Sequence, residues 1–299
     1  MISIPEFIGD LFNPDLAFLP KALVMTVVVA MVCGVVGAHV VLRGMAFIGD
    51  AVAHAVFPGL AVAFVLQGSL LVGGAIAGII TAVLVALFSQ NRRLKEDSII
   101  GVFFVGAFAL GIVIISQAPG YAGSLQSFLF GSITGITDSD MKIASIVGGI
   151  LLLLMFLLHK EFVVVSLDRE MAKSVGLPVL FLDLVLYVMV TIAIVISIQT
   201  IGNVLVLALL VTPAASARLL TDRIVAMMIL GPVLGGVAAL IGIYFSWSLD
   251  LPAGGTVVLV STAMFFLTWV FAPKHGVIMR KLRTRSENAG FSDPSPVTA

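Results

Sequence analysis

The sequence predicts an all-α protein built as a polytopic bundle of transmembrane helices. Of its 299 residues, 60% are hydrophobic and only 11% are charged, and the mean hydropathy is +1.21. A soluble domain typically carries about 25% charged residues. A water-soluble chain of the observed composition would have too little polar surface to cover its core. Long apolar runs recur along the chain, as they do in a protein that crosses the bilayer many times.

Nine apolar segments are long enough to cross a membrane, and the pattern is compatible with eight to ten. A spanning helix needs about 20 apolar residues, because it rises about 1.5 Å per residue through about 30 Å of hydrocarbon. The predicted spans lie near 22–42, 46–66, 69–89, 99–117, 143–158, 179–198, 203–221, 224–246 and 255–272. Pro213 interrupts the apolar run of the seventh span. The segment 124–136 is too short to cross, and it predicts a short re-entrant or interfacial helix covered by protein.

Two polar ends flank the predicted transmembrane domain, which covers residues 21–273. Residues 1–20 carry acidic side chains where a secretory signal would have a basic region. They therefore predict an external surface segment rather than a signal peptide. Residues 274–299 begin with basic residues and continue as a polar tail, which we expect to be disordered.

The distribution of positive charge predicts the orientation of the chain in the membrane. If the loops after the odd-numbered spans face the cytoplasm, fourteen of the sixteen basic residues are cytoplasmic, and only Lys21 and Lys142 are external. The fourteen are Arg43, Arg92, Arg93, Lys95, Lys160, Arg169, Lys173, Arg218, Arg223, Lys274, Arg280, Lys281, Arg283 and Arg285. Basic residues concentrate on the cytoplasmic side of membrane proteins. We therefore expect the N-terminus outside and the C-terminus inside.

Asp50 and His54 are the most prominent ionisable residues within the predicted spans. An ionisable group in the membrane costs at least about 2.5–3.5 kcal/mol and is a functional candidate by default. The spacing i, i+4 places both side chains on one helix face, one turn apart. A carboxylate with an imidazole suits Mn²⁺, Fe²⁺ or Zn²⁺. Pro58 and Gly59 follow closely and predict a break in the helix just beyond the pair.

A purely structural role for this pair is an open alternative, because an Asp–His hydrogen bond could simply join two helices. Two ligands also make an incomplete metal site, since zinc takes four ligands. A two-fold dimer that faces itself across a pore would supply two Asp50 and two His54 side chains. Such a divided site would bind a cation without enclosing it, as transit requires.

The remaining intramembrane ionisable residues point to structural roles. His39 lies near Arg43 at the inner end of its span and is expected at the interface. Asp183 lies near the start of a span, where its charge complements the helix N-terminus. The sequence has no HExxH, Walker A or GxSxG motif. We therefore expect a transport subunit rather than an enzyme, with any ATP hydrolysis in a separate subunit.

The predicted internal segment 166–178 has the features of a short, separately capped helix. Ser166 or Asp168 can cap its start, and Gly176 with Pro178 can end it. Such a helix would present an apolar face to a cytoplasmic partner. An ordinary interfacial linker is the alternative.

The run 41–59 closely resembles the membrane permeases of ABC importers for manganese, zinc and iron. In that family a basic-Met-Ala-Phe run is followed by Gly-Asp-Ala and then by Ser-His-Ala-x-x-Pro-Gly. Here Ala53 stands where serine is usual, and Gly44 where a second arginine is frequent. Further similar segments follow in family order at 129–132, 168–178, 209–218 and 249–255. The resemblance covers roughly residues 20–272.

This resemblance implies a type II ABC importer-like permease of the ABC-3 metal type, working as a homodimer in the bacterial inner cell membrane. It implies that Asp50 and His54 line the metal pathway and bind the ion only in transit, with no permanently bound cofactor. It also implies two ATPase subunits below the membrane and an extracellular metal-binding lipoprotein above it. The coupling helix that would contact the ATPase includes Asp168, Arg169, Glu170, Met171, Lys173 and Gly176. Membrane lipid is a further partner, and no nucleic-acid partner is expected.

Two alternatives to a metal-ion importer stay open. A permease for a bulky metal chelate, such as haem or a siderophore, would need a wide apolar cavity and no metal ligands. An ATP-independent secondary carrier would use Asp50 as a proton-coupling carboxylate. Uptake assays on Asp50 and His54 variants distinguish the chelate permease from a metal-ion importer. Co-purification with an ATPase distinguishes the secondary carrier from an ABC importer.

Overall fold

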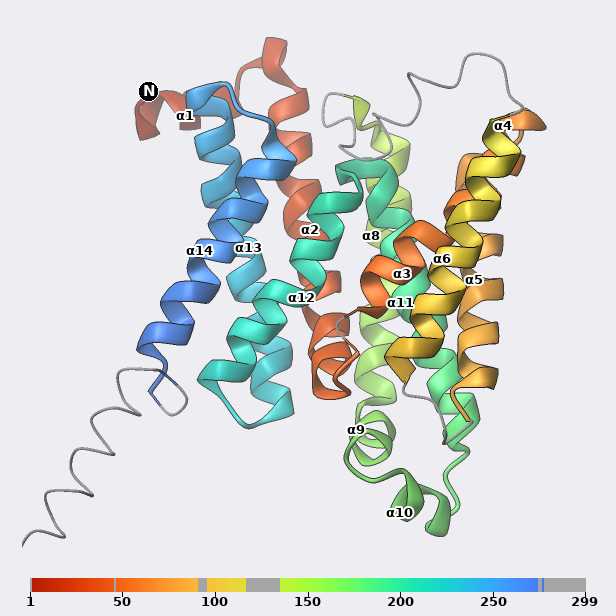
Figure 1. The fold of residues 1–299 in the computed structure, drawn as a ribbon. Helices are drawn as coiled ribbons and strands as arrows, with labels where there is room; N and C mark the ends of the chain where they lie inside the picture. The colour runs from red at the N-terminus through yellow and green to blue at the C-terminus, as the bar shows by residue number, and fades with distance from the viewer. Residues whose placement is uncertain (1, 46, 91–95, 117–134, 274–275, 277–299) are drawn as a thin grey trace, which may run out of the picture.

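The computed structural model describes residues 2–45, 47–90, 96–116, 135–273 and 276, and the regular secondary structure of this part of the chain is all helical. Its elements are α1 (Ile4–Leu11), the 3-10 helix η1 (Pro14–Leu16), α2 (Phe18–Leu42), α3 (Ile48–Ala55), α4 (Phe57–Val65), α5 (Leu70–Phe88), α6 (Glu96–Ile115), α8 (Asp138–Leu157), α9 (His159–Leu167), α10 (Arg169–Ser174), α11 (Val179–Ile201), α12 (Asn203–Leu220), α13 (Ile224–Leu249) and α14 (Ala253–Phe271). The long helices run side by side as one bundle (Figure 1). The predicted all-α fold class is confirmed.

Nine stretches of helix within the described residues are long and apolar enough to cross a membrane. They are Phe18–Leu42, Ile48–Val65, Leu70–Phe88, Asp97–Ile115, Asp138–Leu157, Val179–Ile198, Asn203–Leu220, Ile224–Leu249 and Ala253–Phe271. Each corresponds to one predicted span, and α12 continues through Pro213. The predicted re-entrant helix at 124–136 lies outside the described residues except for its last two positions. The tail 274–299 also lies outside them, apart from Gly276.

The second span is divided into two helices, and the break lies just beyond the Asp50–His54 pair, as the sequence predicts. α3 ends at Ala55 and α4 begins at Phe57, so the interruption precedes Pro58 and Gly59. Proline is favoured in the first turn of a helix, and Pro58 therefore starts α4 instead of ending α3. Because Pro58 has no N–H, it cannot donate to the carbonyl oxygen of His54. The backbone next to the candidate ligands is thus interrupted.

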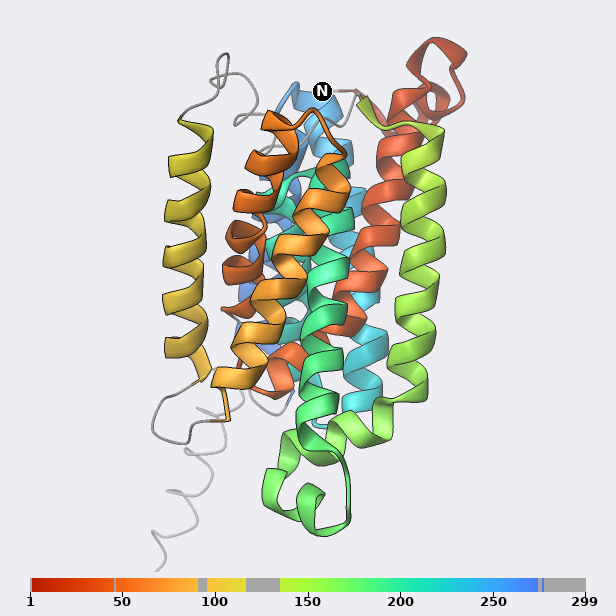
Figure 2. The same cartoon turned by 90° about the vertical axis from the view of Figure 1, so that its right-hand side faces the viewer.

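Close backbone contacts hold α2 in the middle of the bundle, where it packs against α13, α12, α8 and α11 (Figures 1 and 2). Gly34 of α2 lies against the backbone of Gly231 and Pro232 on α13, and Gly37 lies against the carbonyl oxygen of Leu210 on α12. In a bilayer, van der Waals packing between small residues is a main source of helix association. A Cβ atom at Gly34 or Gly37 would collide with this backbone.

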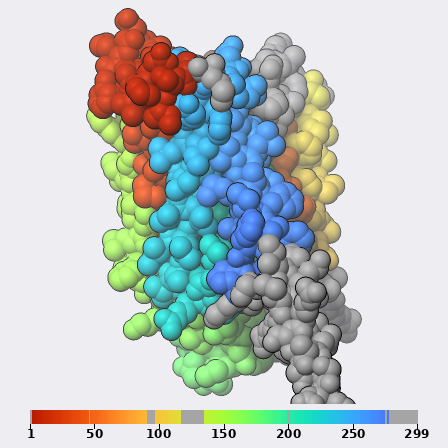
Figure 3. All heavy atoms as spheres, turned by 90° about the vertical axis from the view of Figure 1, so that its left-hand side faces the viewer, coloured from red at the N-terminus to blue at the C-terminus, as the bar shows by residue number. Residues whose placement is uncertain are grey.

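Outer helices present apolar side chains away from the bundle. α6 and α8 lie at opposite sides of it in Figure 2, and α13 and α14 cover the face seen in Figure 3. Val102 on α6, Ile146 on α8 and Leu259 on α14 are all more than 60% exposed. A soluble monomer rarely exposes large contiguous apolar patches. These surfaces are therefore suited to contact with lipid.

The N-terminal helix α1 is attached to one end of the bundle through α13. Phe7 packs edge-to-face on Tyr244, with ring centroids 5.3 Å apart. The indole N–H of Trp247 donates to the Asp10 carboxylate at 2.8 Å. The N-terminal segment therefore lies at the opposite end of the bundle from α9 and α10 (Figure 1).

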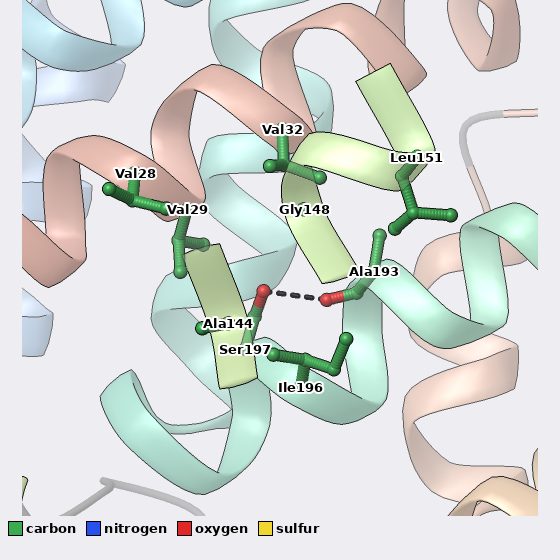
Figure 4. A pocket seen from close by; sticks show the side chains of 9 residues that line it. All are labelled: Val28, Val29, Val32, Ala144, Gly148, Leu151, Ala193, Ile196 and Ser197. Atoms are coloured by element: carbon green, nitrogen blue, oxygen red, sulfur yellow. Dashed lines mark hydrogen bonds between the residues drawn. The ribbon is translucent and has the colours of Figure 1, made fainter. Parts of the chain in front are cut away.

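A small apolar pocket lies between α2, α8 and α11 (Figure 4). Its cavity volume is about 10 Å³, no more than one water molecule needs. It is lined by Val28, Val29, Val32, Ala144, Gly148, Leu151, Ala193, Ile196 and Ser197. The Ser197 hydroxyl donates to the Ala193 carbonyl oxygen at 2.6 Å. With no ionisable group in its lining, this pocket offers no ligand to a metal ion.

We predict that Gly37→Ala destabilises the bundle by about 1–3 kcal/mol, because the added methyl group must displace the α12 backbone. Gly236→Ala is a matched control, since no atom lies within 4 Å of a Cβ placed there. Gly236→Ala should be neutral or stabilising by up to about 1 kcal/mol, because alanine favours the helix. Thermal unfolding in detergent measures both variants. Equal stability of the two would contradict the close α2–α12 contact.

Candidate metal-binding site

Asp50 and His54 lie one turn apart on α3, as the spacing predicts. Nδ1 of His54 is 3.0 Å from the backbone carbonyl oxygen of Asp50 and 3.4 Å from its carboxylate Oδ1. A carbonyl oxygen only accepts hydrogen bonds, so this geometry places a proton on Nδ1. The other ring nitrogen, Nε2, then carries the lone pair that can bind a metal ion. The pair can therefore offer one carboxylate and one imidazole nitrogen.

Aromatic side chains of α6 fix the plane of the His54 ring. Phe104 and Phe108 both meet this ring edge-to-face, with centroid distances of 5.1 and 5.2 Å and interplanar angles of 88° and 77°. Phe47, just before α3, extends the aromatic group through Phe104 at 6.0 Å. Such contacts restrict the imidazole to one orientation. Phe104 and Phe108 could not be linked to His54 from the sequence, because this contact depends on how α6 packs against α3.

The candidate ligands are partly open to the outside of the single chain. The Asp50 side chain is 36% exposed and the His54 side chain is 22% exposed, while neighbours such as Val52 and Ala53 are buried. α3 lies about half-way along the bundle (Figures 1 and 2). No group of three or more His, Cys, Asp or Glu residues that could hold a metal ion occurs in the described part of the chain. One chain thus offers two ligands here.

Asp183 is a buried carboxylate with two arginine partners. Its Oδ1 accepts from Nη1 of Arg43 at 2.5 Å, and its Oδ2 is paired with Nη2 of Arg169. The Asp183 side chain is 3% exposed and that of Arg43 is 5% exposed. Nε of Arg43 also donates to the Ser166 hydroxyl at 3.0 Å. The expected structural role of Asp183 thus involves ion pairs as well as its place near a helix N-terminus.

His39 lies in the last turn of α2, near Arg43, and its side chain is fully buried. Its ring lies 5.9 Å from that of His159 and 5.6 Å from that of Phe162, both on α9. Neither ring nitrogen of His39 has a hydrogen-bond partner. The position is buried because α9 folds back against the end of α2, which span lengths alone do not indicate.

The predicted capped helix in segment 166–178 is present as α10. Asp168 caps it, and its Oδ1 accepts from the backbone N–H groups of Glu170 and Met171 at 2.9 and 3.0 Å. Gly176, with φ of +80°, ends the helix in a left-handed conformation that glycine adopts without strain. Ala172 is buried against the bundle, whereas the cationic Lys173 faces Glu170 on the exposed side at 3.8 Å.

An exposed apolar stripe follows one side of this helix. Met171 and Val175 are four residues apart and are 58% and 61% exposed. Residues four apart lie on one helix face. Leu167, the last residue of α9, is also exposed, but the extended backbone at Asp168 separates it from this face.

The fold defines a multi-pass helical membrane protein with two candidate metal ligands within one span. The ABC 3 transport family model matches residues 15–272. This match covers most of the chain, and the protein belongs to that family.

Similar proteins carry metal-transport names. A manganese transport system membrane protein, MntC, of Halalkalibacterium halodurans is 39% identical over 267 residues, which are 89% of this chain and 91% of that protein. A probable iron transport system membrane protein of Haemophilus influenzae is 35% identical over 88% of this chain and 93% of its own. The solved structure of PsaBC from Streptococcus pneumoniae in complex with Fab contains a chain with 34% identity and a TM-score of 0.81. That match covers 95% of this chain and 100% of the solved one.

We predict that Asp183→Ala lowers the free energy of unfolding by about 3–5 kcal/mol, because it leaves the buried Arg43 guanidinium uncompensated. The exposed Asp15 provides a control, and Asp15→Ala should stay within about 0.5 kcal/mol of the unchanged protein. Thermal unfolding in detergent compares the two. A small, equal effect of both substitutions would show that the ion pairs contribute little.

Proposed function

We propose that this protein is the permease subunit of an ATP-driven importer for a divalent transition-metal ion, and that Asp50 and His54 bind the ion in transit. The observation that carries the proposal is the half-open pair on α3, with a carboxylate and an oriented imidazole one turn apart. Carboxylate and imidazole ligands together suit Mn²⁺, Fe²⁺ and Zn²⁺. The names of the relatives, which cite manganese and iron, support the same class of ion.

A second copy of the chain completes the site in this proposal. Asp50 is 36% exposed in a single chain, and an ionised carboxylate facing lipid would be strongly unfavourable. A two-fold related copy would cover Asp50 and add a second Asp50–His54 pair. The resulting four side chains would hold an ion without enclosing it. The ion then enters from one side of the dimer and leaves from the other.

The proposed orientation puts α10 in the cytoplasm and the N-terminus outside. The basic residues Arg43, Arg218 and Arg223 follow or precede helix ends at the same end of the bundle as α9 and α10 (Figure 1). Clustered basic residues favour the cytoplasmic side. At the other end, an extracellular metal-binding lipoprotein would deliver the ion. In this proposal, the chain lies in a bacterial inner cell membrane.

The exposed apolar stripe of Met171 and Val175 is the proposed docking face for a cytoplasmic ATPase subunit. α10 packs against α9 and α11 and leaves this stripe outside the bundle. An exposed apolar surface rimmed by charged residues is typical of a protein interface. ATP hydrolysis in the partner would move α10 and so switch the permease between two states.

We predict that Asp50→Asn and His54→Ala each reduce divalent-metal uptake by about 10–100-fold or more, because loss of even an indirect metal contact has effects of that size. Uptake of radioactive Mn²⁺ by cells or vesicles that carry the whole transporter measures this. Asp15→Asn, which removes an exposed carboxylate far from α3 in sequence, should leave uptake unchanged. Full uptake by both pair variants would rule out a transit site and favour a chelate permease.

We predict that Met171→Glu weakens association with the ATPase subunit by about 2 kcal/mol, roughly thirtyfold in the dissociation constant, because it places a charge within the apolar stripe. Leu251→Glu is the control, since Leu251 is similarly exposed but follows α13 at the opposite end of the bundle. Co-purification from membranes with the ATPase measures both. Transport by the isolated chain, driven by a proton gradient without any ATPase, would contradict the ABC assignment.

A further inference from the structure

Asp183 joins the proposed docking helix to the end of the central helix. Arg169 is the first residue of α10, and Arg43 follows the last residue of α2. Both guanidinium groups are paired with the Asp183 carboxylate on α11, one oxygen each. Ser166 of α9 adds a fourth element through its hydrogen bond from Arg43. One buried carboxylate therefore connects α2, α10 and α11.

The short loop after Arg43 leads directly to the candidate metal ligands. Met45 in this loop is buried, and the Tyr187 hydroxyl lies 3.4 Å from its sulfur. Tyr187 is one helical turn beyond Asp183 on α11, so two successive turns of α11 hold the same loop. The backbone N–H of Ile48, at the start of α3, donates to the Met45 carbonyl at 3.0 Å. The loop is thus attached to α11 at one end and to α3 at the other.

We propose that Arg169, Asp183 and Arg43 are positioning residues that transmit movement of α10 to α3. This inference rests on the proposed function, because it takes α10 as the contact with the ATPase. Charge pairs in a poorly screened interior resist separation far more than exposed pairs do. A displaced α10 therefore carries the start of α11 with it, and the loop that leads to Asp50 follows. None of the three residues contacts the metal ion in this account.

Arg169 offers the cleanest test, because its side chain is 38% exposed and its replacement leaves the buried Arg43–Asp183 pair intact. Lys160 is the control. It is an exposed cation on α9, the helix that precedes α10. The two substitutions Arg169→Ala and Lys160→Ala thus remove equal charge near the same end of the bundle, and only the first breaks the link to Asp183.

The experiment uses the permease reconstituted in liposomes with its ATPase and its metal-binding lipoprotein. Metal imported and ATP hydrolysed are measured together. Arg169→Ala should lower the amount of Mn²⁺ imported per ATP by about fivefold or more, the lower end of typical coupling between linked sites. Lys160→Ala should keep the ratio of the unchanged protein, and Arg169→Lys should restore part of it. An unchanged ratio in Arg169→Ala would overturn the inference.

A second measurement follows the movement itself. Phe47, beside α3, is 43% exposed, and the single cysteine, Cys33, is buried. In a Cys33→Ala background, Phe47→Cys provides one site for a thiol reagent. ATP with vanadate should change its labelling rate in the assembled transporter, and Arg169→Ala should abolish that change. A persisting change in Arg169→Ala would contradict the proposed route.

Failure of the proposed function and failure of the proposed Arg169–Asp183 link give different results. If the transporter with the native permease does not assemble with an ATPase, or imports no metal when ATP is hydrolysed, the proposed function is wrong. If the native complex couples hydrolysis to import and Arg169→Ala couples equally well, the proposed function stands. In that case Asp183 serves stability alone.

Discussion

The arrangement of this protein depends on one constraint, which is that an ionised side chain cannot be left in hydrocarbon without a partner. Asp183 satisfies it within the chain, because two arginine side chains share its carboxylate. Asp50 does so only in part, because it pairs with His54, a histidine that is charged only when protonated, and about a third of its side chain stays exposed. We infer that the first carboxylate stabilises the fold, and that the second needs a further chain and a cation.

The spans and the candidate ligands could be predicted because both depend on spacing along the chain. Apolar length alone locates each of the nine described spans, and α12 tolerates Pro213 within its helix. The i, i+4 spacing of Asp50 and His54 puts them on one face wherever α3 lies. The capping residues Asp168 and Gly176 likewise mark the ends of α10. Apolar length, i, i+4 spacing and capping residues are all patterns within a short stretch of sequence, so each can be predicted without knowing the tertiary fold.

Contacts between distant segments could not be predicted in the same way. Arg43 and Asp183 are 140 positions apart, and only the packing of α2 against α11 brings them together. His39 is buried because α9 folds over the end of its helix. Phe104 and Phe108 contact the His54 ring only because α6 lies along α3. Each depends on tertiary packing, so span assignment alone could not reveal it.

The central claim is that each chain contributes half of a metal site and that two chains share one ion. The most direct test is the stoichiometry of Mn²⁺ bound to the purified permease, measured by the loss of the free Mn²⁺ signal in electron paramagnetic resonance. The account predicts one ion per two chains, and no binding at this site when Asp50 is replaced by Asn. One ion per chain, or binding that survives Asp50→Asn, would contradict it.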